Sequence, residues 1–530
     1  MTGGLRQRMA WLHTWAGLWV CWLAFAIFLT GTLSVFVHPI SDWMRPEQVQ
    51  EHQQAAFTGP LDHARQLQHG LRYLERHAAD SKMWELWPRA DEEEFQVFWL
   101  NERGFYEDAH LSTATGAALP EPASTVRDTL GGTHFVTFHH ELHAGLTGLW
   151  IVGAASAAML VALISGVITH KRIFQDFFTF RPAKGQRSWL DAHNLAGVLT
   201  LPFLFMIVYS GLAISWATYM PAVSFAQELR TGEAAHVREF GPESKPAGRP
   251  GVLAPLDPLV HQAEATFRTT AFAVVVNHPG DAAMTVDIYS TNTPDTQDGN
   301  LLSKRGVMKF NGISGKLLET EMPHRAPPNG ARATMATLDE LHRLHFAGAV
   351  IRWIYFVAGM AGTAMMATGA ILFMVKRRQK ALNEFGAATQ RVYRLIDVLN
   401  VATIAGLALA CIGFLWSNRL LPLDLVERHE WEVSAFFGVW LLALAHAALR
   451  PAPQAWREQL GAGAALCMLL PLLNVATTGQ HVLGYLARRD LERAAVELTA
   501  IAVGALLAFA ALRVGRRKAS AATVIRKAAS

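Results

Sequence analysis

Cysteine and charge are both scarce in this 530-residue sequence. It has three cysteines, Cys21, Cys411 and Cys467, and 17% charged residues against 51% hydrophobic ones. All three cysteines lie within apolar segments, so no disulfide framework or cysteine-based zinc site is implied. The motif CxxCH is absent, which excludes covalent attachment of a c-type haem by that route. The composition is that of a membrane protein.

No nucleotide-binding motif is present either. The sequence contains no GxGxxG after an expected strand and no Walker loop. An electron-transfer function would therefore need a separate electron donor. The net charge is only +4. The basic residues gather in short loops beside apolar runs, so they indicate membrane topology and give no support for nucleic-acid binding.

Long apolar runs occupy much of the chain. The first is too long for the apolar part of a signal peptide and lacks a small-residue cleavage site, so we expect it to remain as a membrane anchor. A helix needs about 20 apolar residues to cross a membrane. We predict a mostly α polytopic membrane protein with about eight transmembrane helices, over residues 11–37, 146–168, 195–216, 350–375, 398–416, 433–449, 460–476 and 496–512.

Lysine and arginine are concentrated at one set of helix ends. They precede the first helix, fill the loop after the second, follow the fourth and recur in the tail. Because short basic loops stay in the cytoplasm, both termini are predicted to be cytoplasmic. The long polar stretches 39–132 and 220–337 then face outward. The basic loop 488–493 is discordant, but it also carries two acids.

The two outer stretches are predicted to fold as small α+β domains. Residues 61–79 have helical periodicity, and 95–100 have strand character. Gly116 and Gly315 occupy like places in the two stretches, where glycine supplies the positive φ of a turn. We interpret three tryptophans as core residues, with an aromatic-ligand site as the alternative: Trp84, Trp87 and Trp99.

The transmembrane part contains an internal repeat. In the first helix His13 precedes Gly31 by 18 residues, and in the third His193 precedes Gly211 by the same number. The second and fourth helices match at an offset of 203. This offset aligns His139 with His342 and Gly166 with Gly369, and a small gap instead aligns His143 with His345.

Two copies in the same orientation are normally related by a pseudo-two-fold axis along the membrane normal. Such an axis sets His13 opposite His193 near the cytoplasmic side. It sets His139 or His143 opposite His342 or His345 near the outer side. Facing histidines on neighbouring helices are what a bis-imidazole haem requires. Structural or proton-handling histidines, or a different metal, are the alternatives.

Two further residues are candidates for the same sites. Arg352 lies inside an apolar run, where a lone cation is expensive; a haem propionate would be a natural partner, and an interfacial position is the alternative. His170 ends the second helix beside Lys171 and Arg172, so a role in the wet interface is an equal alternative. His446 and His481 in the last helices are interpreted as structural.

Ordered motifs over residues 5–378 resemble the PepSY-associated transmembrane helix family, the iron-regulated membrane proteins. They are LHTWAGLW, FLTGTLSVF and WMRPE; HHELHAG and SGVITHKRIFQDFFTFRP; WLDAHN, LPF and YSGL; and LHFAG, RWIYF and ATGAILF. The segments ending in ATGAAL and NGISGKLLE resemble PepSY domains. The resemblance implies two periplasmic PepSY-like domains on an inner-membrane bundle.

Members of this family include di-haem reductases that release iron from siderophores. The resemblance implies two haem b groups, with His13, His143, His193 and His345 as first candidates for the iron ligands and His139 next. It implies a bacterial inner-membrane enzyme that passes electrons to a ferric siderophore or another ferric chelate. The donor would be a cytoplasmic flavin reductase or a quinol. The alternative is a non-redox, membrane-anchored PepSY binding or regulatory protein.

The resulting domain map has six parts. The C-terminal bundle is expected to stabilise the protein or couple it to a partner without carrying haem. The parts are transmembrane helix 1 (1–38), the first PepSY-like domain (39–132), transmembrane helices 2 and 3 (133–219), the second PepSY-like domain (220–337), helix 4 (338–380) and four further helices (381–530).

Overall fold

The computed structural model divides the chain into two compact units. The first, here the membrane unit, comprises Met1–Gln50, Thr125–Leu212 and Val350–Ser530; the second, the sheet unit, comprises Glu51–Ser124 and Ala213–Ala349. The described residues are 4–47, 63–89, 94–101, 106–119, 127–170, 181, 185–220, 245–291, 306–322, 330–380 and 384–528.

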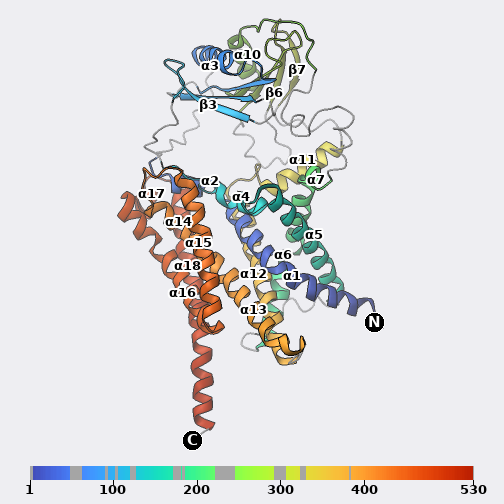
Figure 1. Ribbon diagram of the computed structural model, residues 1–530, viewed down its shortest axis with the longest axis vertical. Helices are drawn as coiled ribbons and strands as arrows, with labels where there is room; N and C mark the ends of the chain where they lie inside the picture. Colours follow the sequence, from blue (N-terminus) through green and yellow to red (C-terminus); the bar gives the residue numbers. More distant parts are fainter. Residues whose placement is uncertain are drawn as a thin grey trace. The chain divides into compact units, whose positions relative to one another are not determined.

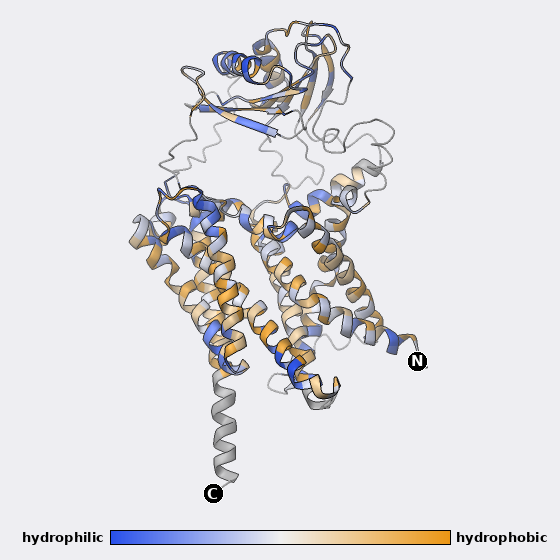
Figure 2. Ribbon diagram, in the orientation of Figure 1, coloured by the Kyte–Doolittle hydropathy of each residue, from blue (hydrophilic) through white to orange (hydrophobic). Residues whose placement is uncertain are grey.

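Eight helices of the described chain are long and apolar enough to cross a membrane, which confirms the predicted number and makes the chain a multi-pass membrane protein. Their apolar residues run along most of their length (Figure 2). They are α1 (Leu5–Ser34), α5 (Gly145–Thr169), α6 (Gln186–Ile214), α12 (Ala349–Lys380), a continuous helix from η3 (Gly386–Ala388) through α13 (Thr389–Val401) and η4 (Ala402–Gly406) to α14 (Leu407–Leu420), α15 (Arg428–Leu449), α16 (Ala452–Thr478) and α18 (Leu491–Ala528).

The described part of the membrane unit also contains three short helices. They are α2 (Val37–Met44), α4 (Thr133–Glu141) and α17 (Val482–Ala487). After α4 the backbone turns sharply into α5, because Leu142, His143 and Gly145 all have positive φ, at 56°, 53° and 53°. Figure 1 shows α14 to α18 packed side by side.

A π-helical turn interrupts the fifth span at η4. A π turn frees backbone groups from the regular ladder, and the Trp440 indole N–H donates to the Ala402 carbonyl over 2.9 Å. Gly406 lies against α15, where an added Cβ would be 2.8 Å from the Ala443 Cβ. The turn therefore fits α14 closely against α15.

Of the three arginines in the discordant loop 488–493, Arg493 is buried, whereas Arg488 and Arg489 are exposed. Arg493 is 6% exposed, and its guanidinium donates to the Asp490 carboxylate and to the Asp42 carbonyl. An arginine held inside the protein does not report membrane orientation as a free loop arginine does.

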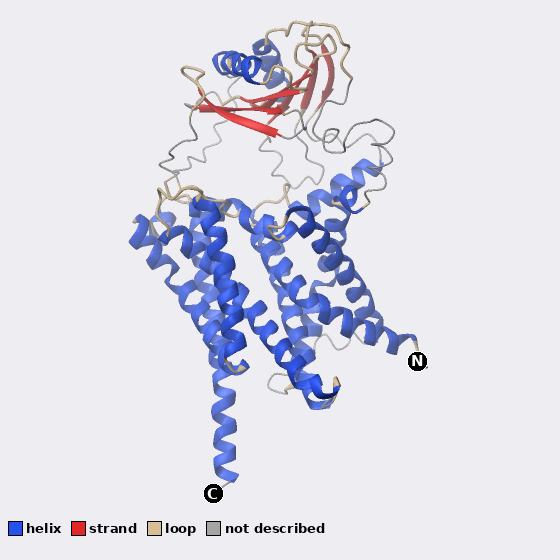
Figure 3. Cartoon of the chain, in the orientation of Figure 1, coloured by secondary structure: helices blue, strands red, loops and turns tan. Residues whose placement is uncertain are grey.

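The strands of both polar stretches join in one antiparallel sheet of order β3-β2-β1-β4-β5-β6-β7 (Figure 3). The sequence led us to expect two domains, but β1 pairs directly with β4, so the two stretches share a sheet. A pairing between segments almost 200 residues apart leaves no local pattern. The strands are β1 (Met83–Trp87), β2 (Glu94–Leu100), β3 (Tyr106–Ser112), β4 (Ala271–Asn277), β5 (Thr285–Ser290), β6 (Val307–Asn311) and β7 (Leu317–Glu321).

Helices α3 (Ala64–His77) and α10 (Leu256–Phe267) cover one face of the sheet (Figure 3). They are joined by a buried pair in which His63 Nε2 lies 2.9 Å from Glu264 Oε1. The sheet unit also contains α7 (Trp216–Tyr219) and α11 (Gly330–Arg343).

The predicted glycine turns occupy equivalent places. Gly116 and Gly315 both have φ of +67°. The Gly116 N–H donates to the Ser112 carbonyl over 2.8 Å, and the Gly315 N–H donates to the Asn311 carbonyl over 2.9 Å. The tryptophans pack as predicted: Trp84 is buried in the core, Trp99 packs against it, and Trp87 contacts the rings of Phe98 and Phe272.

Candidate functional site: histidines of the helix bundle

His13 and His193 lie together inside the membrane unit. They come from α1 and α6, and their ring centroids are 6.3 Å apart with an angle of 56° between the planes. His13 Nδ1 lies 2.8 Å from the Ala162 carbonyl of α5, and His193 Nδ1 lies 2.8 Å from the Met365 carbonyl of α12. Ala162 and Met365 are 203 positions apart, so the two contacts are equivalent in the repeat.

Glycine makes room for each of these rings. A Cβ added to Gly166 would lie 3.0 Å from His13 Cε1, and a Cβ added to Gly369 would lie 3.0 Å from His193 Cε1. The small residues that the repeat aligned are therefore the surfaces on which the imidazoles rest. A larger residue at either position would displace the ring that lies against it.

The pair could hold a metal ion between its two imidazoles. A metal-binding histidine usually donates its second ring N–H to a carbonyl, which fixes the tautomer and leaves the other nitrogen for the metal. Here Nδ1 makes the carbonyl contact in both rings, so Nε2 is the nitrogen left for a metal ion. With metal–nitrogen bonds of about 2.0–2.1 Å, two rings on one metal have centroids roughly 6 Å apart. The separation of 6.3 Å between the ring centroids of His13 and His193 agrees with this value.

His139 on α4 repeats this arrangement elsewhere in the unit. Its Nδ1 lies 2.8 Å from the Ile27 carbonyl of α1. The ring lies over Gly31, where an added Cβ would be 2.5 Å from Nδ1. A carbonyl on Nδ1 and a glycine under the ring are thus common to His13, His193 and His139.

His143 has a different environment. Its Nε2 lies 3.0 Å from Nδ1 of His134, and the two rings stack at 4.9 Å. His134, which was not among the predicted site residues, is fully buried against the rings of Phe414 and Phe436. Its presence in the same run as His139 and His143 was the available signal, but its burial depends on helices almost 300 residues away.

Burial favours the neutral form of His134, His139 and His143. It lowers the pKa of His134 to about 3, and it also lowers the pKa values of His139 and His143. These three rings are therefore imidazoles at neutral pH. Neutral imidazole is the form that binds a metal.

His342 and His345 belong to the sheet unit. His345 is exposed, and its Nδ1 lies 3.5 Å from Glu340 Oε1. Asp339, Glu340 and His345 bring three potential metal-ligand atoms within 4.8 Å of one another, although Asp339 also pairs with Arg343. His342 lies in the last turn of α11.

The other predicted site residues lie at helix ends. His170 is the C-cap residue of α5, and its Nε2 lies 3.0 Å from the side-chain amide nitrogen (Nδ2) of Asn194, the neighbour of His193. Arg352 lies in the first turn of α12 and is partly buried. Among the last helices, His446 contacts Glu458 over 2.8 Å, and His481 accepts a hydrogen bond from the Gly484 N–H.

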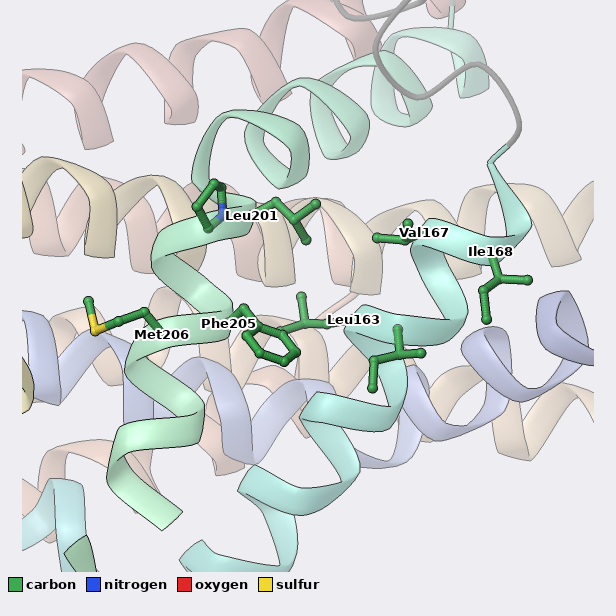
Figure 4. A pocket seen from close by; sticks show the side chains of 8 residues that line it. Leu163, Val167, Ile168, Leu201, Phe205 and Met206 are labelled. Atoms are coloured by element: carbon green, nitrogen blue, oxygen red, sulfur yellow. The ribbon is translucent and has the colours of Figure 1, made fainter. Parts of the chain in front are cut away.

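An apolar groove lies between α5 and α6. Its volume is about 580 Å³, and α5 and α6 supply its walls (Figure 4). Leu163 and Val167 of the wall directly follow Ala162 and Gly166, which contact His13. On the other wall, Phe205 points from α6 toward α5 (Figure 4). The groove is therefore lined by apolar side chains of α5 and α6.

Comparison with known proteins covers most of the chain. Residues 10–376 match the PepSY-associated TM region. An uncharacterized protein of Pseudomonas aeruginosa is 26% identical over 393 residues, which is 70% of this chain and 92% of that protein. The helices from α13 onward lie beyond the matched region.

Proposed function

Because the chain belongs to the PepSY-associated TM region family, we propose that it is a haem-dependent ferric-chelate reductase of the bacterial inner membrane. It would hold two haem b groups and pass electrons from the cytoplasmic side to a periplasmic ferric chelate such as a ferric siderophore. The observation that carries this proposal is the His13–His193 pair. Haem iron supplies reversible one-electron transfer when it is bound.

The first haem is assigned to His13 and His193. Each ring is oriented through Nδ1 by a carbonyl from a neighbouring helix, and each rests on a glycine. A membrane anchor for a non-redox binding domain would have no use for this matched pair. The redox function is therefore preferred to the non-redox alternative.

For the second haem, the ligand proposed from α4 is His139 instead of His143. His139 has the carbonyl and glycine environment of His13 and His193. The Nε2 of His143 is engaged by His134. The sequence repeat aligns His139 with His342, and with a small gap it aligns His143 with His345.

Glycine 31 provides a test of this assignment. Gly31→Ala places a methyl group where the His139 ring lies, so the second haem should be lost or strongly reduced while the first remains. Gly17→Ala on the same helix is the matched control, because an added Cβ there meets nothing within 4 Å. Haem content per purified chain measures both. Retention of both haems in Gly31→Ala would contradict the role of His139.

The orientation proposed from the basic loops places the sheet unit, with its two PepSY-like halves, in the periplasm. The electron donor is a separate cytoplasmic flavin reductase or a quinol, since the sequence has no nucleotide motif. Arg352 is proposed to pair with a haem propionate, by the bidentate geometry that arginine forms with carboxylates.

Membrane vesicles of defined orientation test the function. The haems are first reduced, the excess reductant is removed, and a membrane-impermeant ferric chelate is added outside. Right-side-out vesicles should show rapid haem reoxidation and ferrous iron release, and inside-out vesicles should show neither. Equal rates in both orientations, or no reoxidation in either, would contradict the proposal.

A further inference from the structure

The C-terminal helices pack against the part of the chain that carries His139. We define the C-terminal module as residues 384–528, which follow the family-matched region 10–376. Its contacts reach the segment 127–132 and α4, and they are of two kinds. One is a buried polar lock and the other is an aromatic contact.

The polar lock joins α15 to the segment 127–132, which precedes α4. Arg428 and Glu432 form an ion pair with both side chains fully buried. Glu432 accepts a hydrogen bond from the Thr129 hydroxyl, and Arg428 donates to the Asp128 carbonyl over 3.1 Å. A buried charge is tolerated only when it is paired and hydrogen-bonded, so these groups fix the segment before α4.

A second part of the lock joins α14 to the chain on both sides of the first polar stretch. The Arg127 guanidinium donates to the Asn418 carbonyl over 2.9 Å and to Glu47 over 2.7 Å. Arg419 stacks over the ring of Trp43, with its guanidinium carbon 3.8 Å from the centroid. These residues are buried or nearly so.

The aromatic contact involves α4 itself. The His134 ring stacks on Phe414 at 4.1 Å, and Phe138 meets Phe436 edge-on at 5.5 Å. His134 and Phe138 are four residues apart, so they share one face of α4. His139 points away from that face and contacts α1. The short helix is thus held between α1 and the module.

We propose that the C-terminal module acts as a clamp that positions α4, and that Phe414 and Thr129 are positioning residues for His139. An α4 of nine residues is too short to be stable alone, so its placement depends on what packs against it. Weaker contacts between the C-terminal module and α4 would let α4 rotate. The His139 imidazole would then move away from the Ile27 carbonyl. The consequence for haem rests on the function proposed above, but the clamp itself does not.

Hydrogen exchange of the full-length protein tests the clamp without reference to haem. In Phe414→Leu and in Thr129→Val, the amides of 133–141 should exchange roughly tenfold faster, because local opening becomes easier, while those of the α1 interior stay at parental rates. Phe509→Leu is the matched control, since Phe509 lies in the same module but is exposed. Parental exchange of α4 in both test variants would overturn the proposal, as would an equal increase throughout the bundle.

The electron paramagnetic resonance spectrum of the same samples tests the consequence for His139. In Phe414→Leu the signal of one low-spin haem should shift, and the signal of the other should keep the parental position. Shifts of both signals would indicate general distortion and count against a positioning role. If the parental protein binds no haem, the proposed function fails, while the exchange data still decide whether the clamp exists.

Discussion

Replacing His193 with alanine is expected to reduce the haem content of the purified protein from two groups per chain to one. The ring of His193 is 6.3 Å from that of His13, and alanine leaves a single imidazole at this site. His139 is held on α1 by separate contacts, so the second haem should remain. Absorbance spectra and haem quantification measure the loss, and imidazole added to the medium should restore part of it.

The matched control for this variant is His140→Ala. His140 lies one residue after His139, but it is exposed and its Nδ1 contacts only its own helix. Its replacement should leave both haems in place. A His193→Ala protein that retains two haems, or a His140→Ala protein that loses one, would contradict the ligand assignment.

Arg428→Met is expected to lower the free energy of unfolding by about 3–5 kcal/mol, because it leaves Glu432 as a buried charge without its partner. Chemical denaturation in detergent, followed by tryptophan fluorescence, measures the change. The double variant Arg428→Met with Glu432→Leu removes both charges, so it should recover much of the lost stability.

An exposed ion pair provides the comparison. Arg450, which directly follows the C-terminal end of α15, pairs with Glu458 of α16, and both side chains are partly exposed to solvent. Arg450→Met should change the stability little, because water screens exposed pairs. Similar losses in Arg428→Met and Arg450→Met would show that the buried lock has no special importance.

The parts of the fold that sequence predicts well depend on local patterns. Length and apolarity locate each transmembrane helix, and the repeat aligns His13 with His193 and Gly166 with Gly369. In the structure these residues lie in equivalent contacts. Because the helical period is known, the sequence position of a histidine or a glycine predicts which face of its helix it occupies.

The parts that sequence missed depend on contacts between distant segments. The pairing of β1 with β4 and the stacking of His134 on Phe414 join segments with no shared periodicity. The choice between His139 and His143 turned on which carbonyl or side chain each ring nitrogen meets. Spacing places both rings near one helix end, but it does not set their hydrogen bonds.

The most direct test of the central claim is the haem stoichiometry of the purified full-length protein. A pyridine haemochrome assay, combined with the protein concentration, gives the type and number of haem groups per 58.2 kDa chain. The proposed function predicts two haem b groups per chain, falling to one in His13→Ala and in His193→Ala. A protein that is folded and contains no haem b, or one whose haem content is unchanged by both substitutions, would contradict it.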